Sequence, residues 1–404
     1  MAEDLDVLVV GGGPAGLSTA FTAAAAGRVL VVHRDREIGV PVRTSGGSWQ
    51  GDMDALGIPP SLYSPIDRLV FAAPNAVAHV RFGRQRPVVL DVTETYRFLA
   101  DLARRAGAEI ACATRFAGIG AVDSDGLTCE LVSPKGPILV RAAYVVDASG
   151  WHRAVLRSVG AAERPMRFGV GVEHEFEDLS HQQGTAALIA GRRQAPNGYA
   201  WVFPRRGGSV CIGVGVIRPE ADRPPDELLE ALLASGLPER LGFRLGARLG
   251  AHGGIIPADG PARKVVHGRV VAVGDSAGQA LPLIGEGIRF CIEAGRRAGA
   301  AIANALTDAN ERRAHLCEYE RWWAKRRRRW ERAQKANLRL CGYTDLDWDD
   351  KARLLSLMTG DEVAAVLRME VSTATLVRLL ARHPFQAGGL VLRSRLRRVF
   401  GRHS

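Results

Sequence analysis

The chain has 404 residues, of which 47% are hydrophobic and 24% are charged, and its net charge is +11. This length exceeds the roughly 250 to 300 residues at which a single core stops growing, so we expect more than one folding unit. The composition is typical of a globular α/β enzyme and excludes a disordered or fibrous chain. The basic excess suits a phosphate-bearing cofactor, an anionic membrane surface or nucleic acid.

The spacing of cysteine, histidine and apolar residues excludes several other classes. The six cysteines are scattered without a CxxC pair, and the histidines lack the spacing of metal ligands, so we expect no disulfide framework and no metal site. The N-terminus lacks the features of a signal peptide, and no segment approaches ~18 uninterrupted apolar residues. We therefore expect a cytoplasmic protein that does not span a membrane.

The first 32 residues predict a strand, a glycine turn, a helix and a second strand. Residues 5–10 and 29–32 are short Val-rich runs, which are typical of buried parallel strands. The Ala-rich segment 14–26 between them contains few helix breakers and predicts a helix. This βαβ opening indicates a doubly wound, Rossmann-like domain.

The pattern then alternates between sheet and helix. Strand-like runs occupy residues 69–72 and 78–82, and residues 93–105 predict an amphipathic helix. Residues 166–216 are mostly strand-like and predict a separate antiparallel sheet. Further strands are expected from residue 109 and at 127–132, 138–140, 144–146 and 270–273, and a helix at 288–306.

We therefore expect an α/β fold with a discontinuous Rossmann-like nucleotide-binding domain, an antiparallel-sheet substrate domain and a helical C-terminal region. The expected boundaries are 1–64, 92–164 and 255–310 for the nucleotide-binding domain, 65–91 and 165–254 for the substrate domain, and 311–404 for the C-terminal region.

The first chemical motif is a glycine turn directly after the first strand. Gly11, Gly13 and Gly16 satisfy GxGxxG, and the helix begins at Pro14 and Ala15. The first glycine permits the tight turn, the second lets the backbone approach a pyrophosphate, and the third allows helix and strand to pack closely. The helix N-terminus faces the negative charge, so the motif predicts a dinucleotide site.

The end of the second strand departs from the usual pattern. An acidic residue normally accepts hydrogen bonds from the ribose there, but this chain has His33, followed by Arg34. Two interpretations stay open: a ribose contact by the neutral imidazole, or a histidine merely tolerated at a strand end. Asp35 and Glu37 are substitutes for the missing acid.

The second motif begins where the strand 270–273 ends. Gly274 and Asp275 lead into a glycine-rich loop that contains Gly285 and Gly287 and ends at Ile288. A carboxylate there suits a polyhydroxyl chain, and backbone donors at a helix N-terminus suit the anionic edge of a reduced flavin. The two motifs in this order predict FAD and distinguish the chain from NAD dehydrogenases.

With both motifs, the chain resembles the glutathione reductase-like FAD superfamily. Residues 37–47 and 167–173 narrow the resemblance to geranylgeranyl reductases, and residues 196–204 are similar to that family's PxxYxWxFP signature. The resemblance spans nearly the whole chain. It implies an enzyme that reduces carbon–carbon double bonds of a prenyl or related hydrophobic substrate.

The resemblance also implies roles for individual residues. Arg43, with Thr44 and Ser45 after it, belongs on the cofactor side, Asp275 contacts the ribityl chain, and Gly285 and Gly287 lie beside the isoalloxazine ring. Many archaeal relatives have a cysteine after the arginine, so Thr44 and Ser45 exclude thiol chemistry there. The Asp-Arg dipeptide common before the helix at 93 is replaced by Asp91-Val92.

The expected substrate residues come from the aromatic signature. Tyr199, Trp201 and Phe203 have period-two spacing, which puts all three on one face of a strand, where they line an apolar tunnel or fill a core. Tyr199, Trp201 and Glu286 are the candidate catalytic residues. Tyr199, Glu286 and Glu173 are candidate proton donors by the resemblance alone.

The leading hypothesis is that FAD takes electrons from an external donor, such as NADPH or ferredoxin, and delivers hydride to an alkene. The main alternative is an aromatic or polyketide monooxygenase of the same superfamily. A third is a non-catalytic, FAD-stabilised protein that binds membrane or nucleic acid, although we expect no nucleic-acid partner.

The segment 319–335 is strongly basic and contains three tryptophans. As a helix, it suits peripheral association with an anionic membrane on the cytoplasmic side. The alternative is a solvated helix whose tryptophans dock on the main body.

Overall fold

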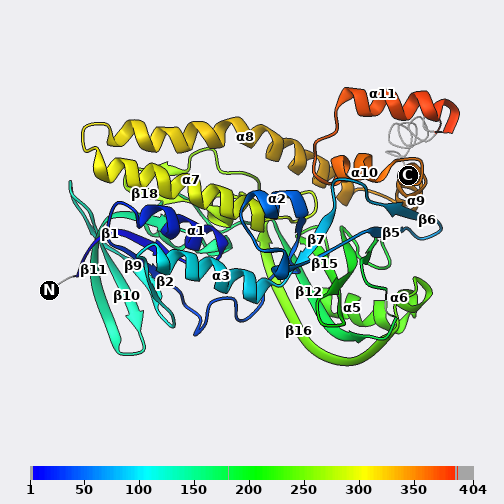
Figure 1. The fold of residues 1–404 in the computed structure, drawn as a ribbon, viewed down its shortest axis with the longest axis horizontal. Helices are drawn as coiled ribbons and strands as arrows, with labels where there is room; N and C mark the ends of the chain where they lie inside the picture. The colour runs from blue at the N-terminus through cyan, green and yellow to red at the C-terminus, as the bar shows by residue number, and fades with distance from the viewer. Residues whose placement is uncertain (1–2, 181, 387–388, 390–404) are drawn as a thin grey trace.

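The structure is a computed structural model that describes residues 3–180, 182–386 and 389. It has two lobes side by side, and helices of the C-terminal region run along one edge of both (Figure 1). The remaining residues of the expected region 311–404, namely 387–388 and 390–404, lie outside the described residues.

The N-terminal lobe contains a parallel sheet of Rossmann type. Its central strands are buried and apolar: Val7, Leu8 and Val9 are fully inaccessible to solvent, so the sheet is covered on both faces. The strand order is β17 (Val266–His267), β18 (Val270–Ala272), β11 (Gly136–Asp147), β1 (Glu3–Val10), β2 (Val29–Val32) and β8 (Glu109–Ala111); β10 (Leu127–Ser133) also pairs antiparallel with β11, and β9 (Arg115–Val122) pairs antiparallel with β10.

The predicted strands at 138–140 and 144–146 are parts of the single strand β11. Arg141 lies between them and stays in the sheet because it pairs with Asp4 of β1 on one side and Thr128 of β10 on the other. Two neighbouring strands thus override the weak local signal.

Helices α1 (Pro14–Ala23) and α7 (Ile288–Thr307) cover this sheet and pack closely on each other. A Cβ at Gly295 would lie 2.2 Å from the Ala15 carbonyl oxygen, and one at Gly299 would lie 2.3 Å from that of Thr19. The glycines therefore allow near-contact of the two backbones. The lobe also contains α2 (Gln50–Ala55), α3 (Val92–Arg105), α4 (Ala154–Ser158) and the short helices η1 (Pro60–Leu62), η2 (Gly150–His152) and η3 (Gly274–Ala277).

The second lobe is built on a seven-stranded, mainly antiparallel sheet. One face packs its buried side chains, such as Val202 and Ile212, on Leu228 and Leu229 of α5 (Pro225–Ala234), which α6 (Leu237–Arg240) follows. The order is β16 (Leu245–Pro257), β12 (Phe168–Asp178), β15 (Ser209–Arg218), β14 (Gly198–Arg205), β13 (Thr185–Ile189), β5 (Arg68–Ala72) and β6 (Val77–Arg81); a separate sheet joins β3 (Gly47–Trp49), β7 (Pro87–Leu90) and β4 (Tyr63–Pro65).

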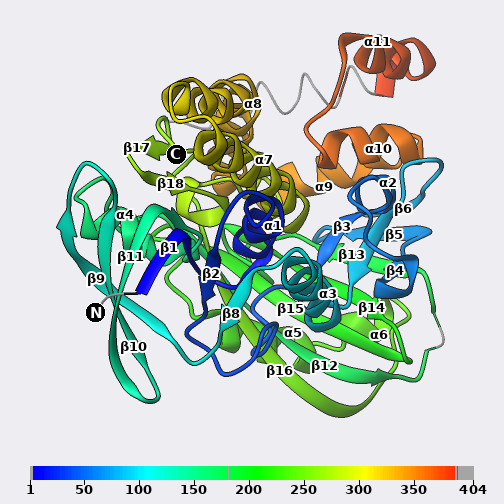
Figure 2. The same cartoon turned by 60° about the vertical axis from the view of Figure 1, so that its left-hand side comes forward.

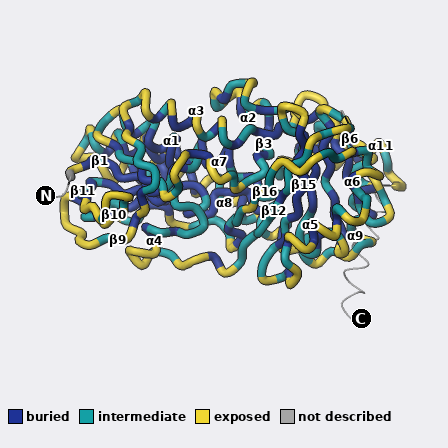
Figure 3. The backbone as a smooth tube through the Cα atoms, turned by 90° about the horizontal axis from the view of Figure 1, so that it is seen from below, coloured by how far each residue is buried: buried dark blue, intermediate teal, exposed yellow. Residues whose placement is uncertain are grey.

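The C-terminal region is helical, as predicted. Its longest helix, α8 (Arg312–Cys341), lies along α7, and α9 (Asp345–Leu355), α10 (Gly360–Leu367) and α11 (Thr373–Arg382) continue over the second lobe (Figures 1 and 2). Buried residues fill the interior of both lobes, and the exposed ones follow the rims (Figure 3). No helix in the described part of the chain is both long and apolar enough to cross a bilayer.

The aromatic residues of the basic segment dock on the body of the protein. Tyr319, Trp323 and Trp330 are each at most 2% exposed. The indole N–H of Trp330 donates to the Gln279 carbonyl oxygen at 2.9 Å, and that of Trp323 donates to another backbone carbonyl at 2.8 Å. These rings stabilise the contact between α8 and the N-terminal lobe, so the face of α8 that stays exposed is rich in charged residues.

Candidate functional site

Two cavities adjoin where the lobes meet. The larger, about 1140 Å³, extends from the glycine turn to Gly287, and the smaller, about 160 Å³, lies against the second sheet. The two cavities share a wall, so a ligand group that lies at this wall is accessible from either cavity. That wall includes Arg43, Thr44, Gly171, Gly254 and Gly285.

The glycine turn forms one end of the larger cavity. Gly11 has φ +121°, and a Cβ there would lie 2.2 Å from the Ala148 carbonyl oxygen, while a Cβ at Gly16 would lie 2.0 Å from the Gly11 oxygen. A Cβ at Gly13, in contrast, would have no protein atom within 4 Å. Gly13, Pro14 and Ala15 line the cavity, so space for a phosphate group lies directly over the turn.

His33 acts within the protein to hold this turn. Its Nδ1 accepts a hydrogen bond from the Gly12 N–H at 3.2 Å. Burial lowers the pKa of His33, which keeps the imidazole neutral and able to accept. The acid substitute Asp35 lies 3.4 Å from the other ring nitrogen and accepts two hydrogen bonds from Arg43, at 2.7 and 3.1 Å. Arg34 lines the same cavity and lies 2.7 Å from a ring nitrogen of His152.

Asp275 lines the larger cavity, and its carboxyl group forms no ion pair with the described residues. It follows strand β18 at the start of η3, next to Gly274, and accepts no side-chain hydrogen bond from the described residues. Burial raises its pKa to about 6, against the lowering influence of Arg153. A half-buried carboxyl group on the cavity wall, without a side-chain donor to it, is suited to a ligand with hydroxyl donors. The volume, the open turn and this carboxyl group together fit FAD.

Arg153 is buried and joins two connecting segments of the chain. The residue is 8% exposed, and its guanidinium forms two hydrogen bonds with Asp259, at 2.8 and 3.0 Å. The ion pair joins the segment after β11 to the segment after β16. No spacing in the sequence indicates this partner, which is 106 positions away.

The loop before α7 is fixed from both lobes. The Tyr199 hydroxyl donates to the Ile284 carbonyl oxygen at 2.6 Å, and the Leu281 N–H donates to the Glu286 carbonyl oxygen at 2.7 Å. Burial raises the pKa of Tyr199. Gly285, Gly287 and Ile288 of this loop line the larger cavity.

The aromatic side chains of β14 lie on one face, as their spacing predicts. The ring centroids of Tyr199 and Trp201 are 5.7 Å apart, and those of Trp201 and Phe203 are 6.3 Å apart. Tyr199 and Trp201 line the smaller cavity, whereas Phe203 packs in a separate core beside Trp49. The expectation that all three line one apolar tunnel is therefore corrected for Phe203.

Trp201 is held in a slot made by glycine and a carboxylate. A Cβ at Gly213 would lie 2.3 Å from the indole ring, so only glycine leaves room for it. The indole N–H donates to Glu173 at 2.9 Å, and Arg205 donates to the other oxygen of this carboxylate at 3.1 Å. Glu173 lines the smaller cavity, but both of its oxygens are engaged.

A histidine and a glutamate on the same sheet face were missed by sequence reasoning. His252 lines the smaller cavity, and its Nε2 lies 3.6 Å from the Glu175 carboxylate. The neighbouring His252 and a hydrogen bond from the Ser209 hydroxyl lower the pKa of Glu175 to about 2 despite its partial burial. The residues are 77 positions apart in sequence and meet only because β12 pairs with β16.

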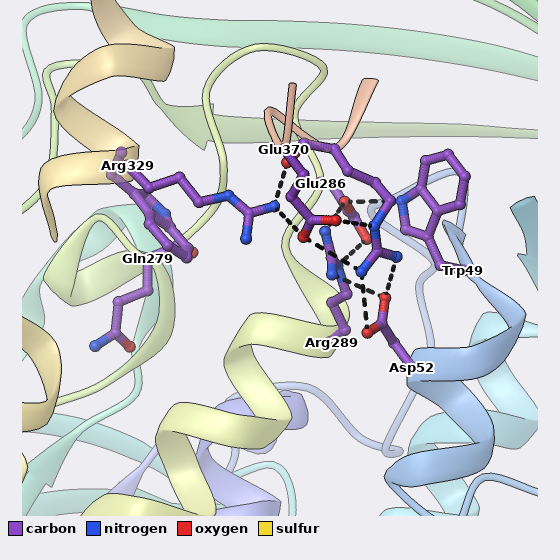
Figure 4. A network of polar contacts seen from close by, with 9 residues as sticks. Trp49, Asp52, Gln279, Glu286, Arg289, Arg329 and Glu370 are labelled. Carbon is purple, nitrogen blue, oxygen red and sulfur yellow. Dashed lines mark hydrogen bonds and ion pairs between the residues drawn. The ribbon is translucent and has the colours of Figure 1, made fainter. Parts of the chain in front are cut away.

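Glu286 belongs to a buried network of ion pairs (Figure 4). Its oxygens accept from Arg289 at 2.5 and 3.0 Å and from the Trp49 indole at 3.3 Å. Arg289 also contacts Asp52 at 2.8 Å, and Arg368 contacts the same carboxylate at 2.6 Å. Glu286 is absent from the lining of both cavities, so its side chain holds the loop from behind.

The C-terminal helices close the smaller cavity. Asn337, Leu340 and Cys341 from the end of α8, and Trp348 from α9, form part of its lining. Arg167 of the second lobe donates to Asn337 at 2.7 Å and so ties the end of α8 to β12. No spacing in the sequence connects these residues to the aromatic signature.

Comparison with known proteins agrees with this architecture. The sequence model of the family described as FAD binding domain matches residues 4–334, so the fold and site define an FAD-binding flavoprotein. The chain is 30% identical, over 94% of its length and 97% of the relative's, to digeranylgeranylglycerophospholipid reductase 2 of Methanothermobacter thermautotrophicus. The chain belongs to the geranylgeranyl reductase family of FAD-dependent oxidoreductases, which confirms the resemblance found in the sequence.

Two solved structures share the fold. A geranylgeranyl bacteriochlorophyll reductase-like protein from Thermoplasma acidophilum superposes with a TM-score of 0.82 at 22% identity, covering 96% of this chain and 99% of that one. Aklavinone-11 hydroxylase, solved with FAD and aklavinone, gives a TM-score of 0.58 at 23% identity, covering 76% of this chain and 63% of that one. The predicted fold class is thus confirmed.

Proposed function

We propose that this protein uses FAD to reduce carbon–carbon double bonds of a prenyl lipid at the cytoplasmic surface of a membrane, with electrons supplied by NADPH or a ferredoxin. The observation that carries the proposal is the apolar cavity beside Tyr199 and Trp201, which shares a wall with the dinucleotide-sized cavity. The name of the relative from Methanothermobacter thermautotrophicus supports a prenyl lipid as substrate. When bound, FAD supplies the hydride chemistry.

The residues of the chain hold the reactants in place and exclude water. Gly13, Asp275 and the N-terminus of α1 would hold the cofactor's pyrophosphate and ribityl parts. Tyr199 positions the loop that ends at Ile288, and Glu286 supports this loop from the other side. Trp201 presents apolar surface to the alkene, and its slot prevents the ring from rotating.

Reduction of a double bond adds a hydride to one carbon and a proton to the other. For the donor of this proton there is a better candidate than the residues expected from the sequence. The Tyr199 hydroxyl proton is committed to a carbonyl oxygen, and the carboxylates of Glu173 and Glu286 accept from neighbouring donors. His252 lines the cavity, and its Nε2 lies 3.6 Å from the Glu175 carboxylate, so the imidazole is a group of the acid–base type with access to the substrate. We therefore assign His252 as the proton donor.

The test is a single-turnover reaction at several pH values. Wild-type protein and the variant His252→Gln are reduced without oxygen and mixed with a prenyl substrate. The variant is expected to retain FAD and to reoxidise at least tenfold more slowly, because general acid catalysis contributes about 10²–10⁴ in rate. An unchanged rate with an unchanged pH profile would refute the assignment.

A monooxygenase is the second candidate, and one observation favours it. Aklavinone-11 hydroxylase shares the fold over 76% of this chain. The same reduced protein mixed with oxygen and an aromatic compound distinguishes the two, since only a monooxygenase yields a hydroxylated product.

A further inference from the structure

The outer face of α8 carries a continuous row of positive charge. Six exposed residues follow one another at alternating intervals of four and three positions, which places them on one side of the helix. The row extends over about 27 Å at 1.5 Å per residue. We call it the basic stripe: Arg321, Lys325, Arg328, Arg332, Lys335 and Arg339.

The stripe differs from the other arginines of the same helix. Arg326, Arg327 and Arg329 each contact a carboxylate, on Glu293, Glu331 and Glu370, at 2.5 to 3.0 Å. Within the described part of the chain, no residue of the stripe forms an ion pair. Neighbouring like charges at these intervals destabilise a helix, so the stripe is unfavourable unless a partner neutralises it.

Helix α11 adds an exposed apolar surface. Leu376, Val377 and Leu380 are 51%, 59% and 45% exposed, and Phe385, just after the helix, is 91% exposed. Thr375 and Leu379, which are 7% and 4% exposed, mark the side of α11 that faces the body. We call the four exposed residues the apolar patch.

The helices that carry the stripe and the patch lie along the same edge of the molecule. Figures 1 and 2 differ by a turn about the vertical axis, and α8 and α11 form the upper edge in both. The segment before α11 is also tied to α8, because Arg329 of α8 contacts Glu370 at 3.0 Å and donates to the Arg368 carbonyl oxygen. A flat surface laid against this edge would therefore meet both helices.

We propose that the basic stripe and the apolar patch together dock the protein on an anionic lipid bilayer. Apolar side chains enter the interfacial region while cations meet the lipid phosphates, and two weak signals of this kind suffice for reversible binding. A nucleic acid would use the stripe but has no use for the patch. The biological purpose of the face rests on the proposed function, because a prenyl lipid is dissolved in the bilayer.

The experiment measures co-sedimentation of the full chain with vesicles of phosphatidylcholine, alone or with about one third phosphatidylglycerol. We expect binding to anionic vesicles at low salt that weakens as salt rises. The variant Arg321→Gln/Lys325→Gln/Arg328→Gln should bind about 100-fold more weakly, since each cation near the surface contributes about fivefold. If the wild-type protein does not bind anionic vesicles even at low salt, the proposal is overturned.

Matched variants separate this face from net charge alone. Arg105→Gln/Lys135→Gln/Arg244→Gln removes three exposed cations from other elements and should bind like wild type. Leu376→Ser/Leu380→Ser should weaken binding even at high salt. Equal loss in both charge variants, or no loss in the leucine variant, would contradict the docking face, as would binding of duplex DNA in preference to vesicles.

Activity assays keep the two proposals distinguishable. The stripe variant should reduce a prenyl lipid embedded in vesicles more slowly but a short, water-soluble prenyl alcohol at the wild-type rate. If no alkene is reduced at all, the proposed function fails while the vesicle result still decides the docking face.

Discussion

We expect Asp275 to make the affinity for FAD fall as the pH is lowered. Its pKa of about 6 lies above the ordinary value of 3.8 because the carboxyl group is buried without a hydrogen-bond donor. Ribityl hydroxyls would donate to the ionised form, so binding lowers this pKa. The affinity is therefore full well above the pKa of about 6 in the empty site and is lost progressively as the pH falls through this pKa.

The magnitude follows from the two pKa values. If FAD returns the carboxyl group to its ordinary pKa, protonation at pH 5 weakens binding about tenfold, or about 1.4 kcal/mol, relative to pH 8. Equilibrium titration of the apoprotein with FAD, followed by flavin fluorescence, measures this change. The variant Asp275→Asn should bind more weakly at pH 8, by roughly 1.5 to 3 kcal/mol.

The variant also supplies the control for other titrating groups. Burial lowers the pKa of His33, and its protonation in acid would remove the acceptor that holds the turn, so any pH dependence that remains in Asp275→Asn measures this second contribution. The reasoning is refuted if the variant keeps the whole tenfold loss between pH 8 and pH 5.

Three further outcomes are expected. Gly13→Val should fold normally but retain no FAD, because its side chain enters the open space over the turn. The control Gly51→Ala, at a glycine that also has no neighbours within 4 Å, should retain full occupancy. Absorbance at the flavin band measures the FAD content of both variants. Trp201→Phe should keep FAD yet slow reoxidation by a prenyl alkene in stopped flow, and an unchanged rate would remove Trp201 from the substrate site. Arg289→Met should lower the free energy of unfolding in urea by about 3 to 5 kcal/mol, since it leaves the buried carboxylate of Glu286 without an ion pair, and a loss below ~1 kcal/mol would show that this ion pair is not needed for stability.

Local sequence signals were sufficient for the cofactor lobe. The turn at Gly11 requires a positive φ, and the Val-rich strands beside it are buried because both faces of the sheet are covered. These features depend on residues within one βαβ unit, so a sequence pattern of about 30 residues is enough to predict them.

The parts that the sequence did not reveal depend on distant contacts. His252 meets Glu175 only through the register of two strands, and Glu286 turns away from the cavities because Arg289 and Trp49 hold it. Trp348 reaches the small cavity from a helix whose position depends on the packing of α8. Spacing along the chain contains no information on such pairings. The sequence could therefore point to candidate residues, but it could not assign the role of each one.

The central claim is that the apolar cavity beside the cofactor takes a prenyl alkene for reduction. The most direct measurement is reoxidation of the anaerobically reduced protein by a geranylgeranyl lipid, with mass spectrometry of the product. The account predicts that the lipid reoxidises the flavin faster than buffer does and becomes heavier by two hydrogen atoms for each bond reduced. A reduced flavin that ignores every prenyl substrate but hydroxylates an aromatic compound in the presence of oxygen would contradict it.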